Sequence, residues 1–255
     1  MSLAAGLLAL LTGIAYTGLG AITAWDLATL RRSRGHSHFG LGFLLMAATC
    51  GPHHLVHATH LLFEGHQAGW PLLAALAVGL PPGAVFTLLR FEALLGGRGD
   101  RFVAGTPGYL AMLPWLVAAA IGATALGAAQ AASAPAGAAG WAGLIANGFL
   151  AAAYLVTGLI VLRTQFARRP GLGGWSVSGV AMGGVFTTCG ASHLVAGLTT
   201  PAELHTLAFD LPGVPAAAFF LWVVYRLNRS SLNDWNRRPL VGRAARHGRP
   251  APWTT

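Results

Sequence analysis

Lysine is absent from this sequence of 255 residues, and acidic residues number only seven. A seven-helix protein that holds retinal needs a lysine amine for the Schiff base, so that class is excluded. The two cysteines form no Cys-x-x-Cys-His motif, which excludes the covalent attachment of a c-type haem. Charged residues make up 9% of the chain, against about 25% in soluble domains. This shortage of charge excludes an ordinary soluble domain and predicts a membrane protein.

Long apolar runs account for most of the sequence, which is 55% hydrophobic with a mean hydropathy of +0.60. A helix needs about 20 apolar residues to cross the hydrocarbon core of a bilayer. Seven runs reach that length, at about 3–30, 39–63, 69–90, 108–132, 140–163, 173–198 and 202–227. The predicted fold class is therefore an all-α polytopic membrane protein with seven transmembrane helices.

The basic residues are 16 arginines, which follow the first, third and fifth runs and fill the C-terminal segment. Because short cytoplasmic loops collect arginine, this pattern predicts an outside N-terminus and a cytoplasmic C-terminus in the plasma (cytoplasmic) membrane. The outer loops then keep only Glu64 and Glu203 as charges. The net charge of +9 is explained by the arginines expected in cytoplasmic loops and by the attraction of the basic tail to anionic lipid heads. The expected partner is the lipid bilayer, and no nucleic acid is expected.

Residues 50–60 read Cys-Gly-Pro-His-His-Leu-Val-His-Ala-Thr-His and place metal-ligating side chains inside the second apolar run. At about 100° per residue these side chains fall on one face, within roughly a third of the helix circumference. A sparser copy, Cys189-Gly-Ala-Ser-His193, lies in the sixth run. In both copies Cys and His stand four residues apart, which is one helical turn. The two runs together predict a metal site.

Thiolate and imidazole ligands suit Cu(I) or zinc, and an apolar setting favours Cu(I), because a thiolate-bound monovalent ion leaves little charge to bury. Copper is the predicted cofactor, with zinc and iron as alternatives. Donors of one ion lie within about 4–5 Å, whereas the ligand run extends about 15 Å along its helix, so one ion cannot use all the ligands. The predicted order from the deepest position outward is Cys50, His54, Cys189 and His193, then His53 and His57, then His60 and His205 at the mouth. A disulfide between the two cysteines is the alternative.

Prolines interrupt two of the runs, at Gly79-Leu-Pro-Pro-Gly83 and at Asp210-Leu-Pro-Gly-Val-Pro215. Because proline removes a backbone donor, a kink or a break of the helix is expected at each position. Two interpretations of Asp210 stay open. It is either a metal ligand or proton relay inside the membrane, or the N-cap of a restarted helix.

The motifs form an internal repeat. Ala15-Tyr16, a basic loop, Cys50-Gly-x-x-His54-Leu and Leu80-Pro81 recur in the same order as Ala153-Tyr154, Arg168-Arg169, Cys189-Gly-x-x-His193-Leu and Leu211-Pro212. Spans one to three therefore match spans five to seven, and with one helix between them both units enter the bilayer the same way round. We predict one membrane domain at 1–228, with repeat 1 at about 1–95, a linker helix at about 105–135 and repeat 2 at about 139–228. Residues 229–255 form a basic cytoplasmic tail.

These residues resemble the copper-binding transmembrane sensor domain of ethylene receptors. That domain is similar in having three helices, an Ala-Tyr in helix one, a basic connection and Cys-Gly-Ala-Thr-His-Leu on helix two. Tyr16, Phe43 and Tyr154 match aromatic positions of the family, and its helix-one Asp corresponds to Ala9 and Asn147. The resemblance implies two such domains fused in one chain, without output domains, and Cu(I) bound by Cys and His as in the receptor dimer.

Three classes of function stay open. The first is a copper-binding integral membrane protein for metal handling or small-ligand sensing, served by an extracytoplasmic metal donor or a separate signalling partner. The second is a membrane-bound copper or di-iron oxidase or hydroxylase, with Asp210 near an open site formed by His53, His57, His60 and His205. The third is an electron carrier with non-covalent haem b between the sixth and second spans. The sequence leaves open whether the chain is an enzyme and which oligomer it forms.

Overall fold

A computed structural model describes residues 1–35, 37–104, 138–199 and 204–229 of the chain. Within these ranges, the side chains at both ends of some helices are not described, and that of His205 is among them. The predicted fourth span at 108–132 and the tail from residue 230 lie outside the described residues.

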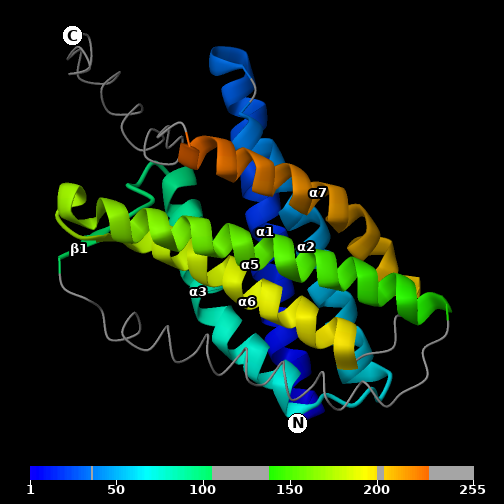
Figure 1. Cartoon of the computed structure of the whole chain (residues 1–255). Coiled ribbons are helices and arrows are strands. Elements are labelled where there is room, and N and C mark those ends of the chain that lie inside the picture. The colour runs from blue at the N-terminus through cyan, green and yellow to red at the C-terminus, as the bar shows by residue number, and fades with distance from the viewer. Residues whose placement is uncertain (36, 105–137, 200–203, 230–255) are drawn as a thin grey trace, which may run out of the picture.

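Six long helices make up nearly all of the described structure (Figure 1). They are α1 Ser2–Arg34, α2 His38–Phe63, α3 Trp70–Leu94, α5 Ala138–Leu172, α6 Val177–Thr199 and α7 Leu204–Arg229. Each is long and apolar enough to cross a membrane, and each overlaps one of the predicted spans. Two short strands, β1 Phe102–Val103 and β2 Trp175–Ser176, pair antiparallel, with Phe102 opposite Ser176.

The outward faces of the helices are apolar. Exposed leucine, isoleucine, phenylalanine and valine side chains follow one another at helical spacing along α1 and α5, at Leu3, Leu7, Leu11, Ile14, Ile145, Phe149, Val156 and Leu159. Stripes of this kind are unfavourable in water and favourable against lipid tails, while a helix satisfies its own backbone polar groups. The fold is that of an all-helical integral membrane protein.

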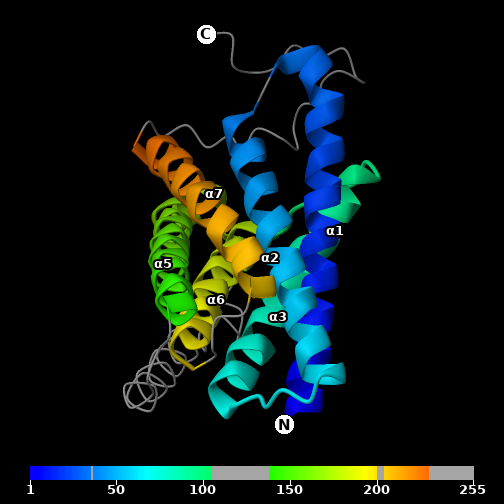
Figure 2. The same cartoon turned by 90° about the vertical axis from the view of Figure 1, so that its right-hand side faces the viewer.

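The helices pack as two groups of three. Helix α1 packs along α2 and α3, and α5 packs along α6 and α7. Between the groups, α3 packs on α6 and α7 packs on α2. Figure 2 shows α1 and α5 on opposite flanks of the bundle. Helix α6 is the most enclosed, with 94% of its apolar span buried against 33–56% in the other five helices. Other parts of the protein therefore surround α6 on nearly all sides.

Helices α3 and α7 continue through their prolines. Pro81 and Pro82 lie inside α3, and Pro212 and Pro215 lie inside α7. Of the expected kink or break, the break is wrong, because a proline removes one hydrogen bond, whereas ending a helix inside the bilayer would expose several unsatisfied backbone groups. A kink at these prolines stays a prediction. The N-cap interpretation of Asp210 is also wrong, because α7 begins at Leu204 and Asp210 lies inside it.

The start of α6 is fixed by side-chain hydrogen bonds. Ser176 Oγ accepts a hydrogen bond from the backbone N–H of Gly179 at 3.0 Å, as an N-cap residue does. Asp100 accepts from the Ser178 backbone N–H at 2.9 Å and from Ser176 Oγ at 2.6 Å. These bonds satisfy donors of the first helical turn and set the position from which α6 carries Cys189 into the bundle.

The glycine that follows each cysteine lets the helices of one group approach closely. A Cβ atom at Gly51 would lie 2.7 Å from the backbone nitrogen of Thr17 on α1. A Cβ atom at Gly190 would lie 2.8 Å from Cγ of Leu155 on α5. Thr17 and Leu155 each follow the tyrosine of an Ala-Tyr pair. Small residues at such contacts are typical of membrane helix packing, and here they hold α2 and α6 in position for their cysteines.

We predict that Gly51→Ala lowers the free energy of unfolding by about 1–3 kcal/mol, because the added methyl group overpacks the contact with backbone atoms of α1. The matched control is Gly18→Ala, where a Cβ would meet nothing within 4 Å. Thermal unfolding of the two variants in detergent checks this. Equal unfolding midpoints for Gly51→Ala and Gly18→Ala would contradict the close contact.

Candidate metal centre

The two cysteines meet in the middle of the bundle. Cys50 on α2 and Cys189 on α6 are both buried and free, and their Sγ atoms lie 3.8 Å apart. One ligand atom of His54 joins them, and all three atoms lie within 4.8 Å of one another. We call Cys50, His54 and Cys189 the sulfur site. Its spacing matches donors that share one ion, and its ligands come from both groups of helices.

A second group of ligands lies next to the sulfur site. One ligand atom from each of His53, His193 and Asp210 lies within 4.8 Å of the other two. We call these three residues the carboxylate site. They come from α2, α6 and α7, and all three are buried. The His53 ring centroid lies 5.0 Å from that of His193 and 5.8 Å from that of His54, so the two sites are neighbours.

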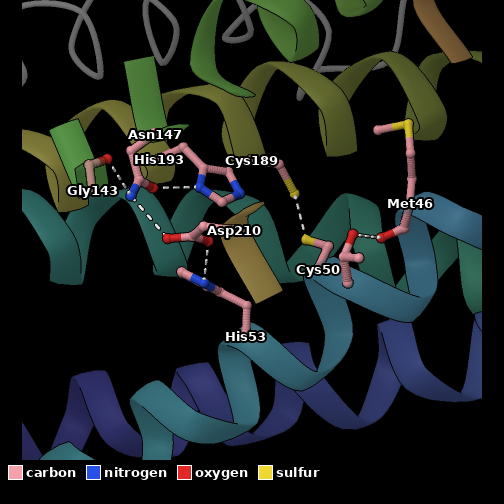
Figure 3. Close-up of polar contacts among 9 residues, drawn as sticks. Met46, Cys50, His53, Gly143, Asn147, Cys189, His193 and Asp210 are labelled. Carbon is pink, nitrogen blue, oxygen red and sulfur yellow. Dashed lines mark hydrogen bonds and ion pairs between the residues drawn. The ribbon is translucent and has the colours of Figure 1, made fainter. Parts of the chain in front are cut away.

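Asn147 on α5 connects two ligands of the carboxylate site (Figure 3). Its Nδ2 donates to Asp210 Oδ2 at 2.9 Å and to the Gly143 carbonyl at 3.0 Å. Both partners only accept, so this end of the amide is the NH₂ group and Oδ1 is the acceptor. His193 Nδ1, 2.7 Å from that oxygen, must therefore carry the proton and donate it. In this neutral tautomer Nε2 keeps a lone pair that can bind a metal.

Aromatic rings enclose the sites from both groups of helices. The Tyr16 ring meets His54 edge-on at 5.7 Å, and the Tyr154 ring meets His193 edge-on at 5.3 Å. Cys189 Sγ also donates to Tyr16 Oη at 3.5 Å. Phe43, two helical turns before Cys50, belongs to an aromatic cluster with Phe39, Phe86, Phe186 and Phe220. These rings and the two cysteines belong to one buried cluster, whose packing restricts the rotamers of the ligands.

Two further histidines, His57 and His60, follow the same face of α2. The His57 ring lies 4.6 Å from that of His53, and both are buried. His60 is one turn further, with its ring 5.0 Å from that of His66 and its Nε2 3.8 Å from a carboxylate oxygen of Glu64. The predicted ligand His205 is in α7, but its side chain lies outside the described residues.

The structure divides the deep ligand set expected from the sequence. His54 lies with the two cysteines, whereas His193 lies with His53 and Asp210. Asn147 is a residue of the site that sequence reasoning noted only as a family position. An amide in an otherwise apolar span could have indicated a role for Asn147. The sequence does not show that Asp210 is its partner, because that contact depends on how α5 packs against α7.

The fold and these residues define the class: a helical integral membrane protein with buried Cys, His and Asp groups that can hold metal ions. Comparison with protein-family models, curated proteins and solved structures finds no match for the chain.

We predict that Asn147→Leu destabilises the metal-free protein, because Asp210 and His193 lose their hydrogen-bond partner inside the bundle. Each buried polar group left unsatisfied costs about 1–3 kcal/mol. The control is Asn228→Leu, because Asn228 is exposed and accepts a solvent-exposed bond from Thr164 at 3.3 Å. Thermal unfolding in detergent should show a clear loss for Asn147→Leu and little change for Asn228→Leu. Equal midpoints would contradict a structural role for the Asn147 amide.

Proposed function

We propose that this chain is a copper-binding integral membrane protein that holds Cu(I) on Cys50, Cys189 and His54. The observation that carries the proposal is the 3.8 Å approach of two buried Sγ atoms from different groups of helices, with a histidine ligand beside them. Two soft sulfur ligands and an imidazole are the donor set that Cu(I) prefers. Zinc on these three ligands would keep an open fourth position, whereas Cu(I) is stable with two or three ligands.

We further propose that the chain is a fused pseudo-dimer of a three-helix unit, similar to the sensor domain of ethylene receptors. The matching packing of α1, α2 and α3 and of α5, α6 and α7 supports this parallel repeat. The equivalent ring pairs support it too, because Tyr16 meets His54 at 68° and Tyr154 meets His193 at 72°. The pseudo-two-fold axis then passes close to the paired sulfurs and along the membrane normal.

A small hollow beside the sulfur site favours sensing of a small ligand, or metal transfer, by the bound Cu(I). The hollow is lined by Thr12, Tyr16, His54, Ala75, Leu76, Gly79, Thr188, Cys189 and Ser192. It reaches two of the three proposed copper ligands and has mostly apolar or hydroxyl walls. The hollow has room for about one water-sized molecule, so the ligand proposed to reach the copper there is very small and uncharged.

The histidine face of α2 supports loading of the metal from one side of the membrane. With the N-terminus outside and the C-terminus in the cytoplasm of a plasma-membrane protein, the buried His53, His57 and His60 lie between the sulfur site and the outer surface. An extracytoplasmic metal donor would meet His60 first. The signal or metal would pass to a separate partner.

Copper content tests the proposed function. Under anaerobic, reducing conditions we expect the purified protein to retain Cu(I) against a chromophoric chelator, and Cys189→Ser to lower the affinity at least about 100-fold, beyond the 10–100-fold typical of outer-shell partners. Ser192→Ala, on the same helix but in neither ligand group, should keep the copper. An unchanged Cu(I) affinity in Cys189→Ser would contradict the proposal. A Soret band without bound copper would favour the haem alternative instead.

Cysteine labelling tests the proposed orientation. The native cysteines are buried, so we expect them to stay unreactive with a membrane-impermeant maleimide in folded protein. Glu64→Cys, in the loop after α2, should react from outside intact cells, and Arg98→Cys, after α3, should react only after permeabilisation. The opposite pattern would overturn the N-out orientation while leaving the metal site untouched.

A further inference from the structure

The carboxylate site has the geometry of ligands that await an ion. His53 Nδ1 lies 2.7 Å from Asp210 Oδ1, which is within ion-pair distance. Yet among the described residues neither of these two buried atoms has a partner with acceptable hydrogen-bond geometry. The two atoms are close, but the N–H direction of the ring does not point at the oxygen. Around one ion with ligand distances of about 2.0–2.2 Å, neighbouring donors lie about 3 Å apart with their lone pairs directed at the ion.

The third ligand is held in the tautomer that a metal requires. Asn147 Oδ1 fixes the proton on His193 Nδ1, and Asn147 Nδ2 fixes the second carboxylate oxygen of Asp210. Metal-binding histidines usually donate their other ring N–H to an oxygen acceptor, and metal-binding carboxylates are themselves hydrogen-bonded. The single side chain of Asn147 supplies both of these hydrogen bonds, one to His193 and one to Asp210.

The other half of the chain has a histidine, His54, in place of His193 but lacks counterparts of His53, Asp210 and Asn147. By the repeated motifs, Ser192 stands where His53 does, Gly79 where Asp210 does and Ala9 where Asn147 does. Gly79 and Ser192 line the hollow beside His54. The same place in the fold is therefore an open hollow in one half and a set of three ligands in the other. Burying one Asp and two His costs desolvation free energy, and without an ion no coordination bonds would offset that cost. Packing alone does not require these polar side chains.

We propose that His53, His193 and Asp210 bind a second metal ion, a divalent transition metal of the Zn²⁺ or Fe²⁺ class, at a site independent of the sulfur site. Two imidazoles and one carboxylate without sulfur suit such ions better than Cu(I). The carboxylate offsets one of the two positive charges in the apolar interior. Three protein ligands also leave positions for water or a ligand, as in open zinc and iron sites.

Cobalt titration of wild-type protein tests this site directly. Metal-free protein in detergent is first loaded with one equivalent of Cu(I) under anaerobic, reducing conditions and then titrated with Co²⁺. We expect ligand-field absorption that saturates at one Co²⁺ per chain, without thiolate-to-cobalt charge transfer. Competition with Zn²⁺ and with Fe²⁺ then shows which ion binds more tightly. Failure to bind Co²⁺, or a thiolate charge-transfer band, would overturn the proposal.

Paired variants separate the two sites. Asp210→Asn should weaken Co²⁺ binding at least about 100-fold, above the range of outer-shell partners, and leave Cu(I) affinity unchanged. Cys189→Ser should do the reverse. The matched control is Asp26→Asn, whose carboxylate pairs with Arg90 at 2.8 Å far from both sites, and it should keep both ions. If Asp210→Asn does not fold, His53→Gln replaces it.

The outcomes are distinguishable from failure of the copper proposal. Loss of the same ion in Asp210→Asn and in Cys189→Ser would mean one shared site and would overturn the second site alone. Unchanged Co²⁺ binding in both Asp210→Asn and His53→Gln would also overturn it. Co²⁺ binding that survives Cys189→Ser supports the second site even if no copper binds.

Discussion

The approach of two sulfur atoms in the dry centre of the bundle is the constraint on which the rest of the structure depends. Cys50 and Cys189 lie 3.8 Å apart on helices from different halves of the chain. Gly51 and Gly190 let each of these helices sit close against its own neighbour, and the tyrosine rings pack edge-on against His54 and His193. Because membrane helices gain little from the hydrophobic effect on one another, such small-residue contacts fix where the sulfurs meet.

Two halves with similar packing carry different chemistry. Beside His54 the bundle keeps a small hollow, and beside His193 it places a carboxylate, an amide and a second histidine. The two groups of helices pack alike, yet the polar ligands gather beside His193 and not beside His54. The soft ligands lie where the halves meet, whereas the carboxylate and amide come from helices of the second half.

The sequence predicted the helices well because a membrane requires long apolar runs and a helical face can be read from spacing. Six predicted spans overlap helices, and Cys50, Cys189 and His54 come together as the repeated motif suggested. Local rules failed at the prolines, since the bilayer penalises a helix end more than one lost hydrogen bond. The sequence could not assign His193 to Asp210 rather than to the cysteines, because that depends on the rotation of α6 against α7. Asn147 was noted only as a family position, because its contact with Asp210 depends on how α5 packs against α7.

The central claim is that sulfur from both halves binds one soft ion. X-ray absorption at the copper edge tests it most directly, on protein loaded with one equivalent of Cu(I). The account predicts a first shell of sulfur at about 2.3 Å with nitrogen at about 2.0 Å, the distances of thiolate and imidazole ligands to first-row ions. A shell of nitrogen and oxygen alone would contradict it.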